Sequence, residues 1–297
     1  MKAGFIGAGK VGFSLGKYLK ENGIEITGYF SKTPESAKSA ADFTNTKHYK
    51  SIEDILSDSD TLFITVPDGQ ISVVWDYMKN LDIKNKNICH CSGSISSTVF
   101  FDGEKYGANI YSVHPLYAVS DKYESWKSLN KAYFTVEGSP ENLEEMKGIF
   151  EKAENKVIAM GSENKSLYHC GAVVVSNLVN GLFSVGAEML VKCGFEREDA
   201  QKALIPLFIG NAQAVAEKGV VSALTGPVER NDLSTIRKHI DAIGAAWNQE
   251  EEEQASFEMM YLLLSEKLIN IAQEKHLGRN YAEMTEVIKN EKHSIHF

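Results

Sequence analysis

The first residues whose spacing could do chemistry form a glycine fingerprint. An apolar strand, Lys2–Ile6, runs directly into the six residues Gly7, Ala8, Gly9, Lys10, Val11 and Gly12, and a helical pattern follows. The first glycine of such a motif permits a tight turn, the second lets the backbone approach a pyrophosphate, and the third lets the helix pack against the strand. Free N–H groups at the helix N-terminus then face the phosphates. A strand–helix turn without a ligand is the alternative, but a second strand follows on schedule, so the sequence predicts a dinucleotide site.

The end of the second predicted strand, 24–30, indicates which dinucleotide binds. Sites for NAD place an acidic residue there, about 20 residues past the glycines, to hold the ribose 2′-OH. This chain continues instead with Ser31, Lys32 and Thr33, and no acid occurs before Glu35. One cation and two hydroxyl groups suit a 2′-phosphate. An ordinary polar turn is the alternative. We expect NADP as the cofactor in preference to NAD.

Polar residues also follow three later strands. Ligands of doubly wound sheets bind beyond the carboxyl ends of the strands. We therefore expect the cofactor to be contacted also by the residues after two of these strands, which are Val66, Pro67, Asp68 and Ser92. His114 comes directly after a strand that we expect to end at Val113, and it precedes a proline. Because the pKa of histidine lies near working pH, His114 is a candidate general acid or base. The alternative is a turn histidine bonded to backbone.

Three more candidates belong to the C-terminal half. His169 and Asn177 lie eight residues apart on one predicted helix, about 12 Å along nearly one face. We expect Asn177 to donate to a substrate carbonyl and His169 to assist; a buried polar pair is the alternative. Arg230 follows a Thr-Gly-Pro turn and is a candidate clamp for a substrate carboxylate, unless it forms a surface ion pair. Asp232 is expected to cap the next helix. We also predict that His114 and Arg230 face one cleft.

The elements that position these residues divide into two halves. Strands and helices alternate up to about Gly161, which predicts an α/β doubly wound Rossmann sheet over residues 1–161. Residues 162–297 contain helical patterns only. The first would be a single helix of about 30 residues beginning at Ser162 and ending before Gly194, about 45 Å long. The others are expected over 197–218, with a kink at Pro206, over 233–247, and from the acidic run at 250–253 to 278.

Composition excludes several classes of partner. The 297 residues carry a net charge of −9, which argues against nucleic acid or an anionic membrane as the main partner. No apolar run approaches the ~20 residues of a membrane span, 259–264 being the nearest, and the chain opens on a core strand, so we expect a cytoplasmic protein without a signal peptide. The four cysteines contain no C-x-x-C pair; we expect reduced thiols and no metal site.

Four stretches carry a resemblance to known reductases: 65–68, 112–116, 169–177 and 223–232. The chain resembles the 6-phosphogluconate dehydrogenase-like reductases, and in particular a family of predicted oxidoreductases with a Rossmann-like first half and a C-terminal domain of unknown function. Pyrroline-5-carboxylate reductases, deazaflavin-dependent NADP reductases and prephenate dehydrogenases are more distant relatives. The resemblance implies a C-terminal domain like that of 6-phosphogluconate dehydrogenase, and NADP use. It also implies a catalytic role for His114, because prephenate dehydrogenases carry their catalytic histidine in a similar His-Pro pair.

One departure from the resemblance matters for the mechanism. Related hydroxyacid dehydrogenases place a catalytic lysine four residues before the helix asparagine, where this chain has Val173, and Lys165 lies three turns before Asn177. We therefore expect an NADP-dependent oxidoreductase that acts on a C=O or C=N carbon of a small, anionic substrate without lysine chemistry. An NADP-binding redox sensor without turnover and a dimerisation protein with a vestigial site are the alternatives. The length of the first C-terminal helix predicts a homodimer formed through the helical domain.

Overall fold

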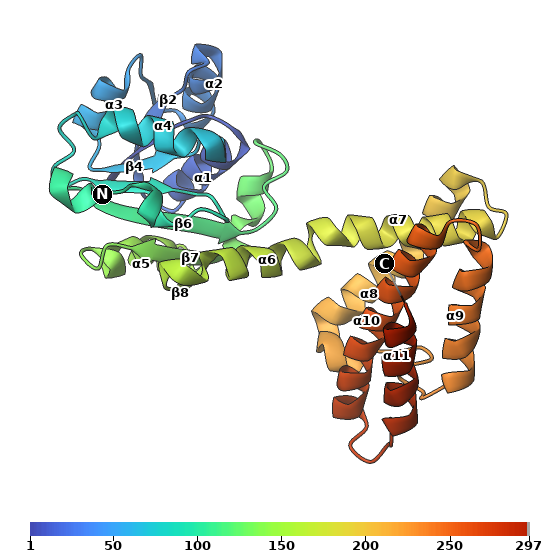
Figure 1. Ribbon diagram of the computed structural model, residues 1–297. Helices are drawn as coiled ribbons and strands as arrows, with labels where there is room; N and C mark the ends of the chain where they lie inside the picture. The colour runs from blue at the N-terminus through green and yellow to red at the C-terminus, as the bar shows by residue number, and fades with distance from the viewer. Residues whose placement is uncertain (296–297) are drawn as a thin grey trace. The chain divides into compact units, whose positions relative to one another are not determined.

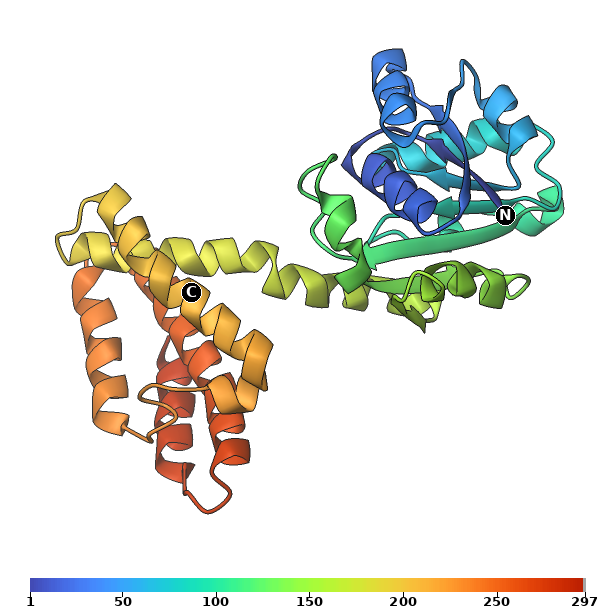
Figure 2. The same ribbon diagram turned by 180° about the vertical axis from the view of Figure 1, so that it is seen from behind.

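The computed structural model describes residues 1–295, and its contacts divide the chain into two compact units, 1–175 and 176 onward (Figure 1, Figure 2). The first unit contains a sheet and its helices. The second unit contains helices. The boundary predicted near Gly161 precedes the helix that ends the first unit.

The sheet of the first unit has eight strands in the order β3-β2-β1-β4-β5-β6-β7-β8. All neighbours are parallel except β6 and β7. Strand order reverses between β1 and β4, so the carboxyl ends of these two strands border the crevice where such sheets bind ligands. The predicted doubly wound sheet is confirmed. Its strands are β1 Lys2–Ile6, β2 Glu25–Phe30, β3 Lys47–His48, β4 Thr61–Ile64, β5 Asn87–His90, β6 Asn109–Leu116, β7 Tyr133–Gly138 and β8 Lys156–Ala159.

Two separate hydrophobic cores cover the two faces of this sheet, because alternate strand residues point to opposite faces. Phe5 and Phe63 belong to the core beneath α1 (Lys10–Glu21), α2 (Pro34–Thr44) and α5 (Leu143–Glu151). Ile6 and Ile64 belong to the core beneath α3 (Ile52–Asp58) and α4 (Asp68–Met78). Short 3-10 turns η1 to η4 connect the later elements, and they span Ser97–Val99, Gly103–Tyr106, Ser125–Lys131 and Ser162–Asn164.

Helix α6 (Lys165–Val175) ends the first unit, and the second unit has its own core around Ile236, Leu262 and Ile288. Its helices are α7 Asn177–Lys192, α8 Arg197–Ala223, α9 Leu233–Ala246, α10 Glu251–Lys275 and α11 Ala282–Ser294. Three predicted helix signals are confirmed. Gly194 follows α7 with φ +95°, Asp232 caps α9 by accepting from Thr235 N–H at 3.1 Å, and acidic residues fill the first turn of α10.

Several element boundaries differ from the prediction. Strand β6 does not end at Val113 but continues to Leu116, so His114 lies inside the strand. The reason is the antiparallel partner β7, which pairs with this extension and places Thr135 opposite His114. The pairing of β5 with β6 ends at Ser112 of β6. Pro115 lies beyond this pairing, so its missing N–H costs no hydrogen bond to β5. The sequence pattern predicts a strand over 61–66, but β4 ends at Ile64. The two-residue strand β3 and helix α11 were not predicted.

The predicted 30-residue helix is interrupted. Ser162 begins a 3-10 turn instead of capping the helix, and α6 and α7 are separated by Ser176, which has φ −119° and ψ −75°. Three consecutive valines precede the break, and β-branched residues have lowered helix propensity. In α8 the non-helical residue is Gly219, with φ +74°, and not Pro206. Glycine adopts positive φ without a steric cost, which explains the position of that kink.

The expectation that no stretch is apolar enough to span a bilayer was wrong. The stretch Ser162–Lys192 is long and apolar enough by length and composition, with a mean hydropathy of 1.5 and only 6% of the apolar window buried. Exposed aliphatic side chains also occur on α8, among them Leu207 at 63% exposure. These helices therefore present an apolar surface that the chain does not cover by itself.

Candidate functional site

The turn after β1 is held tightly against the end of β4. Gly7 has φ +107°, and a Cβ there would lie 2.8 Å from the backbone of Thr65. A Cβ on Gly12 would lie 2.3 Å from Oγ1 of Thr65. That hydroxyl donates to the carbonyl of Gly7 at 2.8 Å. The roles predicted for Gly7 and Gly12, a tight turn and close helix–strand packing, are confirmed.

The N-terminus of α1 meets the requirements of a pyrophosphate site. Gly9 is the N-cap and provides no side-chain cap, which leaves the N–H groups of the first turn, from Lys10 to Gly12, for a ligand. Nothing lies nearer to a Cβ at Gly9 than the Thr65 carbonyl at 3.9 Å, so the backbone there is open to a close approach. Ala8 and Lys10 flank this N-cap. The predicted turn therefore fits the pyrophosphate of a dinucleotide.

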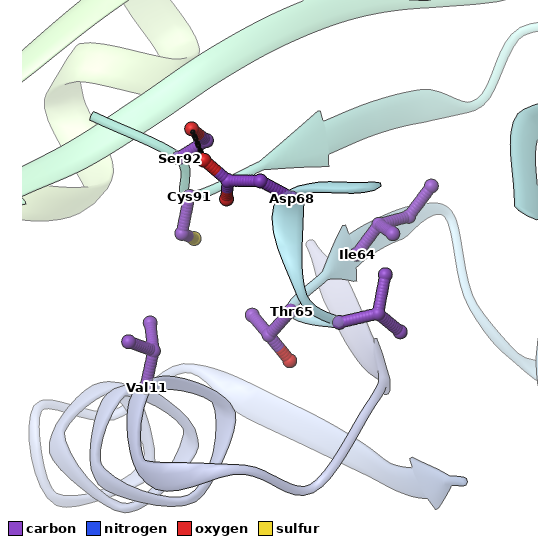
Figure 3. A pocket seen from close by; sticks show the side chains of 7 residues that line it. Val11, Ile64, Thr65, Asp68, Cys91 and Ser92 are labelled. Atoms are coloured by element: carbon purple, nitrogen blue, oxygen red, sulfur yellow. Dashed lines mark hydrogen bonds between the residues drawn. The ribbon is translucent and has the colours of Figure 1, made fainter. Parts of the chain in front are cut away.

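A small cavity of about 80 Å³ lies between this turn and the ends of β4 and β5. Figure 3 shows Val11, Thr65, Asp68 and Ser92 around it. Val66 also lines the cavity, whereas Pro67 is the exposed N-cap of α4. The structure thus brings together four of the residues predicted to contact the cofactor, which are Val11, Val66, Asp68 and Ser92.

The turn that follows β5 is hydrogen-bonded to Asp68 at the edge of this cavity. The hydroxyl of Ser92 donates to Asp68 Oδ2 at 2.8 Å, as drawn in Figure 3, and the hydroxyl of Ser94 donates to the same oxygen at 3.1 Å. Ser92 Oγ also accepts from the N–H groups of Ser94 and Ile95, at 3.2 and 3.1 Å. These contacts fix the backbone on both sides of Gly93.

The polar turn after β2 is available to a phosphate. Ser31 Oγ accepts from the N–H of Thr33 at 3.3 Å, and Thr33 is the N-cap of α2 without a side-chain cap. Lys32 is exposed, and its ammonium has no ion pair or hydrogen bond among residues 1–295. An unpaired cation beside two hydroxyls at a helix N-terminus is suited to a phosphate dianion.

Two imidazoles converge on Gly93. A Cβ at this position would lie 2.7 Å from Nδ1 of His169 and 2.9 Å from Nε2 of His114. Nδ1 of His169 is buried and has no hydrogen-bond partner in the described part of the chain. Gly93 follows β5, His114 lies in β6 and His169 lies in α6. Three elements of the first unit therefore bring two predicted catalytic residues to one point.

The environment of His114 keeps its ring uncharged. Its Nδ1 lies 2.7 Å from the hydroxyl of Tyr168. Burial, together with the nearby Lys165 and His169, lowers the pKa of His114 to about 3, and Asp68 opposes this shift only weakly. The predicted role as an acid or base with a pKa near working pH is therefore wrong in its premise. His114 is a neutral imidazole at neutral pH.

Lys165 lies beneath this histidine. Only 1% of its surface is exposed, and its Nζ donates to Ser112 Oγ at 2.8 Å. Burial lowers the pKa of Lys165, and Glu137 opposes this effect. His90 is also buried in this layer, and burial lowers its pKa to about 4. A buried layer of ionisable groups thus underlies the two converging imidazoles.

The remaining predicted residues belong to the second unit. Asn177 is the exposed first residue of α7, and its Oδ1 accepts from Ser176 Oγ at 3.0 Å. Because the helix is interrupted at Ser176, the expected alignment of His169 and Asn177 on one helical face is not observed. Arg230 is exposed, and its guanidinium has no hydrogen bond or ion pair among the described residues. Its sharing of one cleft with His114 stays a prediction.

Four residues that shape the site are not predicted as site residues. The sequence predicts no role for Tyr168 or Ser112, places Gly93 only at the end of a strand where ligands bind, and puts Lys165 three turns before Asn177. A usable signal existed: Lys165, Tyr168 and His169 are spaced i, i+3, i+4 on one helical face. Ser112 and His114 are spaced i, i+2 on one face of a strand.

Two parts of the chain match known families. Residues 2–88 match the family described as "NADP oxidoreductase coenzyme F420-dependent", and residues 132–268 match a domain of unknown function, DUF2520. The first part of the chain is thus similar to an NADP oxidoreductase domain, and much of the second part is similar to DUF2520. These two matches confirm the resemblance drawn from the sequence and the choice of NADP as cofactor.

Solved structures share the fold of this chain. A protein from Thermotoga maritima matches with a TM-score of 0.71 and 23% identity, covering 92% of this chain and 99% of that one. An imine reductase from Pseudomonas sp. matches with a TM-score of 0.60 and 13% identity, covering 92% and 97%. The NADP-bound pyrroline carboxylate reductase of Plasmodium falciparum gives 0.51 and 16%, covering 84% and 96%. No curated protein sequence matches the chain.

Proposed function

We propose that the protein moves a hydride between NADP(H) and the C=O or C=N carbon of a small, anionic substrate. The observation that carries this proposal is the convergence of His114 and His169 on Gly93, on the turn that Ser92 and Asp68 fix at the edge of the cofactor crevice. A purely structural pair of histidines would have its ring nitrogens satisfied, whereas Nδ1 of His169 is buried without a partner in the described chain.

Two parts of the first unit bind the cofactor in this proposal, and two histidines contact the substrate. The free N–H groups at the N-terminus of α1 bind the pyrophosphate, and the turn at 31–33 binds the 2′-phosphate. The bound dinucleotide supplies or accepts the hydride. His114 and His169 hydrogen-bond to the substrate oxygen or nitrogen, where negative charge develops during reduction, and a proton from solvent water completes the alcohol or amine.

The second unit supplies the substrate contacts in this proposal. Arg230 binds a carboxylate in bidentate fashion, for which its unpaired, exposed guanidinium is suited. Asn177 donates its amide N–H to a substrate carbonyl. Imine reductases and a pyrroline carboxylate reductase occur among the structures of the same fold, and we extend their substrate class, C=N compounds, to this chain as one of the two possibilities.

We further propose that two copies associate through their helical domains in the cytoplasm. The apolar stretch 162–192 and the exposed side chains of α8, such as Leu207, need a cover. A second copy covers both at once through a two-fold interface, and Gly181, with nothing within 4 Å of where a Cβ would lie, allows close approach of a helix. Light scattering at micromolar concentration should give about twice 32.9 kDa. A monomer, or recovery of the protein with lipid vesicles, would contradict this arrangement.

NADPH oxidation measured against a panel of keto acids and cyclic imines tests the proposed function. NADPH binding is measured in parallel by fluorescence titration. We expect tight NADPH binding and turnover with at least one carboxylate-bearing compound. Binding without turnover on any compound would contradict the enzyme and favour a redox sensor. Absence of NADPH binding would contradict both readings.

A further inference from the structure

Helix α6 is attached to strand β6 by two matched side-chain contacts. Lys165 and Tyr168 lie one turn apart on one face of the helix, and Ser112 and His114 lie two residues apart on one face of the strand. Lys165 Nζ contacts Ser112 Oγ at 2.8 Å, and the Tyr168 hydroxyl contacts His114 Nδ1 at 2.7 Å. The two contacts fix the helix and the imidazole together.

The contact with Tyr168 bears on which nitrogen of His114 carries a proton. Burial raises the pKa of Tyr168, so its hydroxyl keeps its hydrogen and is able to donate it to Nδ1, which is the direction we adopt. A neutral imidazole that accepts at Nδ1 carries its own hydrogen at Nε2. Nε2 is the nitrogen near Gly93, so the N–H of His114 is presented on the side where the second imidazole converges.

Burial lowers the pKa of His114 most, and the charges around the ring add to this effect. Lys165 and His169 approach it from α6 and His90 from β5, and all three disfavour a positive charge on the ring. Asp68 in α4 is the group that opposes them. The carboxylate of Glu137 in β7 acts on Lys165 and is already bonded to the N–H and hydroxyl of Ser97, at 2.7 and 2.6 Å.

We propose that Lys165 and Tyr168 are positioning residues, which hold His114 as the uncharged Nε2–H tautomer with its N–H directed past Gly93. The inference rests on the proposed function only in taking that N–H as the donor to the substrate. Tyr168 fixes the tautomer, and burial of the ring together with the nearby Lys165 disfavours protonation of Nδ1. His114 therefore stabilises negative charge on the substrate as a neutral hydrogen-bond donor and not as a charged acid.

Nitrogen NMR of the histidine side chains tests this directly, in the full-length protein with NADP⁺ bound. In the wild type, His114 should give the neutral Nε2–H pattern at every pH from 5 to 8. Lys165→Met should raise the pKa of His114 by one unit or more, because a nearby positive charge is removed. Lys50→Met, at an exposed site outside this layer, is the matched control and should leave the pKa of His114 unchanged.

Tyr168→Phe is the second variant, and it keeps the proposal testable if the buried lysine variant does not fold. Loss of the phenol should mix the two tautomers of His114 and lower kcat at least tenfold with little change in KM. Tyr106→Phe is the control, at an exposed position packed against Trp75. A wild-type His114 that titrates near 6.5, or that carries its proton on Nδ1, would overturn the inference. The NMR measurement needs no turnover, so a failure of this inference can be distinguished from a failure of the proposed function.

Discussion

His169 closes over Gly93 so tightly that its Nδ1 lies 2.7 Å from where a Cβ would stand. Real Cβ atoms do not approach other atoms so closely, and the imidazole of His114 blocks the same position at 2.9 Å. One missing methyl group therefore permits two histidines to meet at the end of β5.

Replacing this glycine should separate the two imidazoles. We expect Gly93→Ala to destabilise the protein by about 1–3 kcal/mol through overpacking and to lower turnover at least tenfold. Gly148→Ala is the control, because nothing lies within 4 Å of a Cβ at that position in α5. Urea unfolding and NADPH oxidation measure both effects. Unchanged turnover in Gly93→Ala would show that the convergence serves packing only.

Cofactor preference should depend on the turn after β2. A charge-assisted contact between Lys32 and a 2′-phosphate is worth roughly 1.5–3 kcal/mol, so NADPH should bind about ten- to a hundredfold more tightly than NADH. Lys32→Asp should reverse the preference through like-charge repulsion. Lys38→Asp, on an exposed position of α2, should leave it intact. Equal dissociation constants for both cofactors in the wild type would identify 31–33 as a solvated turn.

Acid should destabilise the first unit at a pH above that at which most carboxylates titrate. His90 and His114 have pKa values lowered to about 4 and about 3 in the folded protein, whereas an unfolded histidine has a pKa near 6.5. Their stabilising contribution is complete above pH 6.5 and is lost as pH falls towards the folded values, because the unfolded chain then binds more protons. Between these pH values, the free energy of unfolding should fall by up to about 1.4 kcal/mol per pH unit for each histidine.

Chemical denaturation between pH 7 and pH 4 measures this slope. His90→Asn should remove one of the two contributions and flatten the dependence, even if the variant is less stable at pH 7. A free energy of unfolding that stays constant from pH 6.5 to pH 4.5 would show that these histidines are not held neutral.

Substrate binding should depend on the turn before α9. Arg230→Ala should raise KM for a carboxylate substrate about ten- to a hundredfold, with a smaller effect on kcat, since the lost contact binds a group remote from the reacting carbon. Arg237→Ala, an exposed arginine on α9, is the matched control. For an uncharged analogue of the substrate, wild type and Arg230→Ala should have the same KM. Equal KM values for wild type and Arg230→Ala would remove Arg230 from the site.

Much of the fold follows from local sequence signals. The glycine fingerprint, the alternation of strands and helices, the Asp232 cap and Gly194 each depend on a few neighbouring residues, and each is confirmed. The errors arise where a distant partner decides the outcome. Strand β6 extends past Val113 because β7 pairs with it, and no signal within β6 reports that partner.

The candidate site shows the same division. His114 and His169 were singled out from residue type and context, but the prediction assigned His114 a pKa near neutrality. The pKa of its ring is lowered by burial first and by the nearby Lys165 second, and Lys165 is held there by Ser112, 53 positions away in the chain. Lys165 does not occupy the position of the catalytic lysine in related hydroxyacid dehydrogenases. Its role becomes visible only from the strand that its helix covers, where it contacts Ser112.

Deuteride transfer from NADPH labelled at C4 tests the central claim most directly. The wild-type protein is incubated with the labelled cofactor and the active compounds of the keto acid and cyclic imine panel, and the products are analysed by mass spectrometry. The account predicts one deuterium on the former C=O or C=N carbon. It also predicts that His114→Asn lowers the rate of labelling about a hundredfold while the dissociation constant for NADPH stays unchanged. Tight NADPH binding with no label in any product, or undiminished labelling by His114→Asn, would contradict it.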